Sequence, residues 1–232
     1  MKVYAMKKFD QDLAALGARV MEMGMLAQQM VSMARLAMTD LRSMYQKVLK
    51  AEDQLDKMQL EIDHEAVRLL IIYGPVAGDL RYVLSVSHVN AALERIGDQA
   101  VGLCHSLDSA HQQPDPALLP TPLAMGERAE VMVKDAMLAF FKRDAELARS
   151  IMSRDDSLDD LNDQVLSRTL SDDEKAVGEK KNVASAVAQI LMARTWERIG
   201  DQATNICEEV IYIVQGEDVR HAGKGKPAKI SR

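Results

Sequence analysis

Four pairs of acidic residues could bind a cation, because the two members of each pair are four residues apart. They are Glu52 with Asp56, Glu94 with Asp98, Asp155 with Asp159, and Glu197 with Asp201. On a helix such residues lie one turn apart on the same face, where like charges repel by roughly 0.2–0.5 kcal/mol. Carboxylate oxygens are hard ligands suited to Mg, Ca, Mn and Fe, and Zn also accepts them. The pattern therefore predicts a surface metal site, with one or several ions, in each half of the chain.

Any one of these pairs, taken alone, is more often an ordinary solvated stretch of helix surface. Arg95 and Arg198 stand beside two of the pairs and partly neutralise them. The metal hypothesis is favoured because both kinds of pair recur at corresponding positions in the two halves. The residue types admit Fe, Zn, Mn or Mg and do not choose among them.

An internal repeat accounts for this recurrence. Residues 94–100, Glu-Arg-Ile-Gly-Asp-Gln-Ala, are identical to residues 197–203, and the same spacing carries Cys104 onto Cys207. Upstream of about residue 40 the spacing is one residue shorter, which a turn would tolerate. Seven identical residues at corresponding positions are not expected by chance, so we interpret the sequence as an internal duplication.

Apolar residues recur every three or four positions in both halves, which is the spacing of an amphipathic helix. Three helices are predicted per half, at 10–48, 52–73 and 77–107 and again at 123–153, 155–174 and 179–215. The acidic pairs then lie on the second and third helix of each half, with Glu94 and Asp98 facing away from the apolar stripe that contains Ile96. The predicted fold is all-α, two tandem repeats of an up-and-down three-helix bundle.

Four of the six prolines lie between the two halves, where they favour a linker over a continuous helix. The predicted organisation is a first repeat at 1–110, a Pro-rich linker at 111–122, a second repeat at 123–215 and a flexible basic tail at 216–232. The tail either keeps the protein in solution or makes an electrostatic contact with a partner or a membrane surface.

Composition agrees with a helical protein and excludes several functions. The chain has 232 residues, of which 47% are hydrophobic and only 4% aromatic, and its formal net charge is −6. A protein that grips nucleic acid usually has a basic excess, so we expect no nucleic-acid partner. No apolar run reaches 18 residues and no secretory signal opens the chain, so we expect a cytoplasmic protein without direct membrane insertion.

Other candidate sites are weaker. Glu61-x-x-His64 has the spacing of di-iron bundle ligands, but it is not repeated and His64 is predicted to point away from the core. His105 is predicted to lie about 10 Å beyond Asp98 along the helix, too far to share one ion. The lone cysteines are expected to be small buried residues. No nucleophile stands with a base, although a metal-dependent enzyme or metal store of the carboxylate-bridged helical-bundle class stays as the alternative.

At these same residues the sequence resembles the PhoU family of phosphate-specific transport system accessory proteins. The Glu-Arg-Ile-Gly-Asp segments of both halves are similar to the paired signature of that family. Further similar segments are Pro75–Arg81, Asn205–Glu208 and Gly216–His221. The resemblance covers about residues 6–221. One departure is that the second half reads Gly178–Val183 where a second Pro-x-x-Asp-Leu-Arg turn would stand, so roles of Asp79 or Arg81 do not transfer to it.

The resemblance implies a six-helix, non-enzymatic protein, commonly a homodimer, that binds metal clusters at the four acidic pairs. It implies negative regulation of phosphate uptake and of phosphate-starvation signalling. The implied partners are the ATPase subunit of the phosphate ABC transporter and the membrane sensor histidine kinase of the phosphate regulon. Through them the protein would be cytoplasmic and peripheral to the inner membrane.

Overall fold

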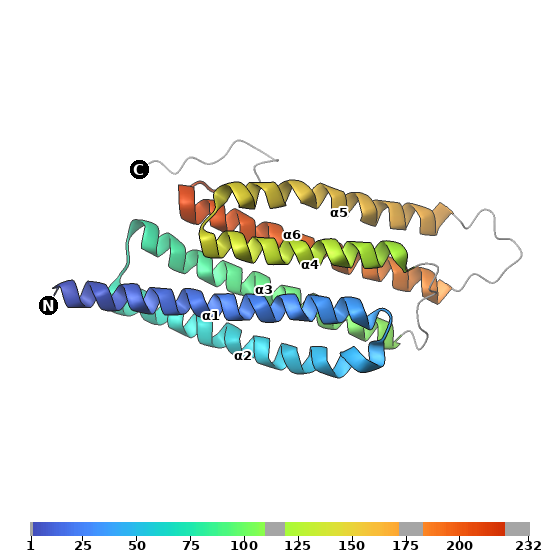
Figure 1. Cartoon of the computed structure of the whole chain (residues 1–232), viewed down its shortest axis with the longest axis horizontal. Helices are drawn as coiled ribbons and strands as arrows, with labels where there is room; N and C mark the ends of the chain where they lie inside the picture. The colour runs from blue at the N-terminus through green and yellow to red at the C-terminus, as the bar shows by residue number, and fades with distance from the viewer. Residues whose placement is uncertain (1, 110–118, 172–182, 221–232) are drawn as a thin grey trace, which may run out of the picture.

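The computed structural model describes residues 2–109, 119–171 and 183–220, and these residues form six helices without a strand (Figure 1). The helices are α1 (Lys2–Ala37), α2 (Leu41–Tyr73), α3 (Ala77–Ser109), α4 (Pro120–Lys142), α5 (Ala145–Ser171) and α6 (Val183–Gln215). The prediction of an all-α protein with three helices in each half is confirmed.

The two three-helix bundles lie side by side. α1 packs on α4 and α3 packs on α6, whereas α2 and α5 contact only helices of their own repeat among the main helix contacts. α2 and α5 therefore form opposite edges of the molecule (Figure 1). A single apolar core runs through both bundles and includes Leu55, Leu93, Leu158 and Trp196, none of them exposed. None of the described helices combines the length and the apolar character needed to cross a membrane.

Two packing contacts show how the repeats are related. A Cβ atom on Gly24 of α1 would lie 2.5 Å from Cε of Met137 on α4, and one on Gly126 of α4 would lie 3.1 Å from Cγ of Arg35 on α1. Gly126 and Met137 are the repeat counterparts of Gly24 and Arg35. The contact is therefore reciprocal, as in a two-fold interface, and the glycines let the two backbones approach closely.

The first turn of each repeat was predicted in the wrong place. α1 ends at Ala37 instead of 48, and α2 begins after Asp40, whose Oδ1 accepts a hydrogen bond from the backbone N–H of Ser43 at 3.2 Å. α4 ends at Lys142 instead of 153, and Asp144 Oδ1 accepts from the N–H of Leu147 at 2.9 Å. The apolar spacing continues across both turns, so the capping aspartates were the better signal.

The predicted linker and the predicted tail each overlap the described residues. Pro120 and Pro122 lie in the first turn of α4, where a missing N–H costs no helical hydrogen bond. Residues 216–220 fold back on the bundle: Val219 packs on the core, and Arg220 lies 3.7 Å from the carboxylate of Glu209. The remainder of the predicted linker, 111–118, and of the tail, 221–232, falls outside the described residues.

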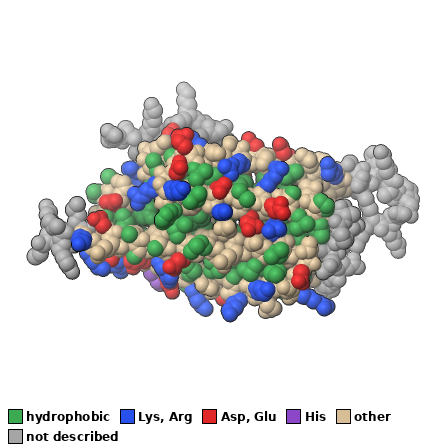
Figure 2. Space-filling model, in the orientation of Figure 1, with side chains coloured by type: hydrophobic (Ala, Val, Ile, Leu, Met, Phe, Trp, Pro, Cys, Tyr) green, Lys and Arg blue, Asp and Glu red, His purple; other side chains and the backbone are tan. Residues whose placement is uncertain are grey.

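The face made by α1 and α4 is mixed in character. Hydrophobic side chains lie between charges of both signs over this face (Figure 2). Leu36 of α1 and its repeat counterpart Leu138 of α4 are 42% and 38% exposed. Arg35 on α1 also forms an ion pair with Glu130 on α4 at 3.2 Å. Ion pairing and the close approach at Gly24 and Gly126 therefore both hold α1 against α4.

Candidate metal-binding surfaces

The second and third helix of each repeat approach closely at a glycine inside the acidic signature. A Cβ atom on Gly97 would overlap Cδ2 of Leu55 on α2, and one on Gly200 would lie 2.6 Å from Cδ2 of Leu158 on α5. Leu55 and Leu158 are repeat counterparts. Because any larger residue would push the helices apart, the two glycines bring the flanking carboxylates of neighbouring helices towards one another.

We call the resulting groups the first patch and the second patch. The first patch is Glu52 and Asp56 on α2 with Glu94 and Asp98 on α3, and the second is Asp155 and Asp159 on α5 with Glu197 and Asp201 on α6. In both, the first member of each pair is half-buried and the second is exposed. The outward placement predicted for Glu94 is thus only partly right, since this side chain is half-buried.

The carboxylates of the first patch raise one another's pKa values across the two helices. Burial raises the pKa of Glu94 above its ordinary value, and the charges of Asp98 and of Asp56 raise it further. The pKa of Asp98 is raised by burial and by Asp56, and that of Glu52 by burial and by Asp56. Asp56 on α2 thus acts on both acids of α3, and each would be relieved by a bound cation.

The carboxylates of the second patch also raise one another's pKa values, and they are more buried than those of the first patch. Burial followed by the charge of Asp201 raises the pKa of Asp155 to about 6. Burial also raises the pKa values of Glu197 and Asp201, and the charge of Asp159 raises both further. Oδ1 of Asp155 is buried without a hydrogen-bond partner. The Thr204 hydroxyl faces Asp155 and offsets part of the rise, although the two groups make no hydrogen bond of good geometry.

The patches fit a hard cation in chemistry but are not assembled around one. Over the described residues, no three His, Cys, Asp or Glu side chains come close enough together to hold a metal ion. The donor set is nevertheless purely carboxylate, and Asp155 offers an orphaned oxygen. Binding a cation would require the exposed acids, such as Asp98 and Asp201, to turn inward. The eight predicted ligands therefore stay a prediction.

His105 lies beside the first patch. Its Nδ1 is 2.7 Å from the hydroxyl of Tyr45, and the two rings meet edge to face. Burial and the charge of Asp56 raise the pKa of Glu52, and His105 offsets part of this rise, so His105 on α3 lies near Glu52 on the neighbouring α2. Tyr45 was not singled out in the sequence, and a lone tyrosine offers no signal for this contact.

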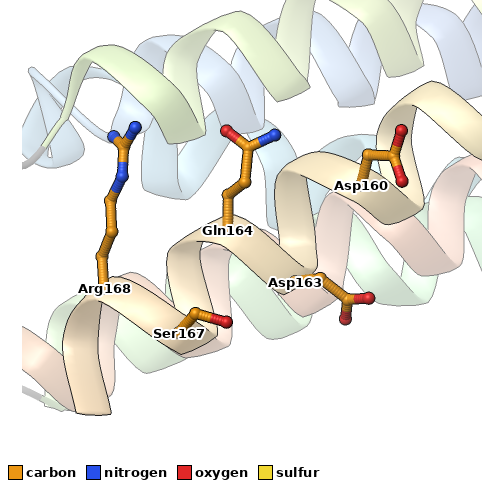
Figure 3. A pocket seen from close by; sticks show the side chains of 5 residues that line it. All are labelled: Asp160, Asp163, Gln164, Ser167 and Arg168. Atoms are coloured by element: carbon orange, nitrogen blue, oxygen red, sulfur yellow. The ribbon is translucent and has the colours of Figure 1, made fainter. Parts of the chain in front are cut away.

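The remaining candidates do not add ligands. Cys104 and Cys207 are buried, and burial raises their thiol pKa values to about 11 and about 12, which makes them unreactive. His64 is exposed on the outer side of α2, as predicted. A shallow hollow of about 510 Å³ lies on α5 and contains no predicted ligand (Figure 3). Its lining residues are Asp160, Asp163, Gln164, Ser167 and Arg168.

A polar cluster between the repeats also escaped the sequence analysis. Glu209 of α6 is buried, accepts a hydrogen bond from Ser85 Oγ at 2.6 Å, and lies 2.9 Å from Nδ1 of His88. Ser85 and His88 belong to α3. The signal was a charged residue next to the core stripe of α6, which indicates a buried pairing partner. This cluster ties α3 to α6 and anchors Arg220.

Comparison with known proteins settles the family. The model of the PhoU domain matches the chain twice, at residues 20–107 and 123–210, one match for each repeat. The chain belongs to the PhoU family. The two matches include all eight acids of the two patches.

Full-length relatives agree with this assignment. The phosphate-specific transport system accessory protein PhoU of Escherichia coli is 31% identical over 218 residues, which cover 93% of this chain and 89% of that protein. The homologue from Clostridium acetobutylicum is 30% identical over 217 residues, covering 92% of this chain and 97% of that protein.

Solved structures show the same fold. The crystal structure of PhoU from Pseudomonas aeruginosa superposes with a TM-score of 0.81 at 31% identity, covering 90% of this chain and 99% of that one. The phosphate transport system regulatory protein PhoU from Streptococcus pneumoniae superposes with a TM-score of 0.82 at 24% identity, covering 91% and 99%. The second likeness bears on the fold alone.

Proposed function

We propose that this PhoU-family chain is a non-enzymatic negative regulator of phosphate uptake and of phosphate-starvation signalling. The observation that carries the proposal is the match of both repeats to the PhoU domain. Relatives at about 30% identity over nearly the whole chain are named accessory proteins of the phosphate-specific transport system, and none of these names describes an enzyme.

The proposed mechanism is that of an adaptor. Its partners are the ATPase subunit of the phosphate ABC transporter and the membrane sensor histidine kinase of the phosphate regulon. Contact with these partners would keep the chain at the cytoplasmic side of the inner membrane. The edges of the molecule suit this role, because the two patches lie on helix pairs that include α2 and α5.

The proposed role of a bound metal ion is electrostatic. Glu52, Asp56, Glu94 and Asp98 would hold a cation on one edge, and the corresponding acids of the second patch would hold one on the other. A bound cation supplies positive charge that neutralises the acids whose pKa values are raised by their neighbours. Each patch would then change from a repulsive surface to one that accepts an acidic or polar partner.

Gene deletion tests the regulatory role. We expect the deletion strain to make phosphate-regulated alkaline phosphatase at high phosphate, and wild-type chain to restore repression. The double variant Asp98→Asn/Asp201→Asn, which alters one exposed acid in each patch, should fold and fail to restore it. Absence of derepression in the deletion strain would refute the regulatory role.

Co-purification tests the adaptor role. The tagged full chain should capture the ATPase subunit and the kinase, and a chelator should weaken the capture. Capture of neither partner by a chain that complements the deletion would refute the adaptor mechanism while leaving the regulatory role in place.

A further inference from the structure

A histidine where α3 packs on α6 is held by a buried carboxylate and is open to solvent. Nδ1 of His88 on α3 lies 2.9 Å from Oε1 of Glu209 on α6, and Ser85 Oγ donates a hydrogen bond to Oε2 of the same carboxylate at 2.6 Å. The side chain of Glu209 is 6% exposed, whereas that of His88 is 55% exposed. One edge of the imidazole is therefore fixed by the protein while the ring remains accessible.

The contact with Glu209 decides which nitrogen of His88 carries the proton. A carboxylate only accepts hydrogen bonds, so Nδ1 donates to it and Nε2 keeps its lone pair when the ring is neutral. Nε2 lies on the side of the ring away from the carboxylate. An imidazole oriented in this way is a nucleophile, and the carboxylate stabilises the positive charge that the ring gains when Nε2 forms a bond.

The repeat fold does not require this pair. At the offset of 103 residues, the counterpart of His88 is Leu191 and the counterpart of Glu209 is Ser106. The equivalent positions of α6 and α3 therefore pack without an acid and without an imidazole. Helix packing alone does not account for a solvent-accessible histidine backed by a buried acid.

The charges around His88 favour an anionic reagent over a metal ion. A carboxylate behind an imidazole also suits metal binding. Within the part of the chain that the structure describes, however, no third His, Cys, Asp or Glu comes close enough to His88 and Glu209 to complete a metal site. Nη1 of Arg220 lies 3.7 Å from Oε1 of Glu209 and adds positive charge, part of which Asp218 neutralises at 2.6 Å.

We propose that His88 is a phosphoryl acceptor, modified at Nε2 by a small acyl phosphate. The lone pair of Nε2 attacks the phosphorus atom, an N–P bond forms, and the bond between phosphorus and the acyl oxygen breaks. The acyl group leaves as a carboxylate with the electron pair of that bond. The proton on Nδ1 stays on the ring, which becomes positively charged beside the Glu209 carboxylate.

The modification would act where the C-terminal residues are anchored. A phosphoryl group on His88 adds negative charge and strong acceptor oxygens near Arg220, which is held at Glu209. Arg220 could then pair with the phosphoryl oxygens. The reaction requires no transporter, kinase or metal patch, so its failure would leave the proposed function untouched.

Reaction of the full chain with acetyl phosphate at neutral pH tests the acceptor. Peptide mapping under alkaline conditions, which preserve the N–P bond, should place one phosphoryl group on His88, and phosphorus NMR should show substitution at Nε2. Two other histidines are controls, because His64 is exposed on α2 and Nδ1 of His105 lies against the hydroxyl of Tyr45. His88 should react at least roughly tenfold faster than either. A wild-type chain without a phosphoryl group on His88, or with equal amounts on His88 and His64, would overturn the proposal.

Replacing the acid tests the role of Glu209. Glu209→Gln keeps the size of the side chain and removes its charge, so phosphorylation of His88 should slow at least roughly tenfold. The matched control is Glu217→Gln, which removes an exposed acid of the same C-terminal region and should react as wild type does. Circular dichroism checks the fold of both variants, and the comparison of histidines in wild type needs neither. An unchanged rate in a folded Glu209→Gln chain would overturn the proposal.

Discussion

Glu52 and Asp155 occupy equivalent positions in the two repeats, yet their surroundings differ. Glu52 reaches the rim of the first patch, near His105, and has no buried oxygen without a partner. Asp155 is one carbon shorter, so its Oδ1 is held against the helix pair, 3.1 Å from where a Cβ atom on Gly200 would lie. The same arrangement of acidic pairs has therefore produced one patch that is more solvated and another that is more desolvated.

The two repeats have kept the glycine–leucine contact between their second and third helices more strictly than the residues around it. Gly97 and Gly200 both face a leucine of the second helix at close range. Around this contact the residues diverge, as Leu93 in the first repeat corresponds to the buried Trp196 in the second. If the account is right, perturbing the contact should destabilise both repeats, and neutralising the acids should affect the second repeat more than the first.

The largest effect should come from the leucines at the contact. Leu55→Ala and Leu158→Ala each remove a fully buried side chain and leave a cavity, so each should lower the free energy of unfolding by about 3 kcal/mol. Urea denaturation of both variants measures this. A difference of more than about 1.5 kcal/mol between them would show that the two contacts are not equivalent.

A smaller loss should follow when the glycines are replaced. Gly97→Ala and Gly200→Ala force the helices apart, and the gain in helix propensity offsets part of the cost, which leaves a net destabilisation of about 1–2 kcal/mol. The loss should be greater at Gly97, because its Cβ atom would overlap Leu55 more closely than that of Gly200 would overlap Leu158. Thermal unfolding gives the order, and a stabilised Gly97→Ala variant would contradict the close approach.

Substitutions of the acidic residues should change the stability of the protein by different amounts in the two repeats. Because the folded protein raises the pKa of Asp155 from 3.8 to about 6, the folded state binds this proton more tightly than the unfolded chain does. Stability should fall as pH rises between these values, and the loss should be complete above them. In chelator at pH 7, Asp155→Asn should therefore stabilise the fold by about 1 kcal/mol, after allowance for its partial exposure.

Glu52→Gln is the matched change in the first repeat. It should stabilise less, since no oxygen of Glu52 is buried without a partner. Urea denaturation at pH 4 and pH 7 measures the free energy of unfolding of both variants. An equal gain in the free energy of unfolding of the two variants at pH 7 would contradict the proposed difference between the patches.

Much of the fold and part of the site could be predicted from the sequence. The repeat and the apolar spacing predicted the six helices of the described residues, whereas the role of the duplicated acidic pairs as ligands stays a prediction. The turn after Ala37 was missed because the apolar spacing runs through it, although Asp40 offered a capping signal. How closely the carboxylates converge depends on the helix separation that Gly97 and Gly200 allow. Packing across two helices sets this separation, and spacing along one helix does not reveal it.

The central claim is that each repeat carries a cation-binding carboxylate patch, and metal content measures it most directly. The full chain would be loaded with Mn²⁺, desalted and analysed by mass spectrometry as wild type, Asp98→Asn, Asp201→Asn and the double variant. The account predicts that each single variant keeps about half of the wild-type metal, because one patch is left intact, and that the double variant keeps almost none. Unchanged metal content in the double variant would contradict the account.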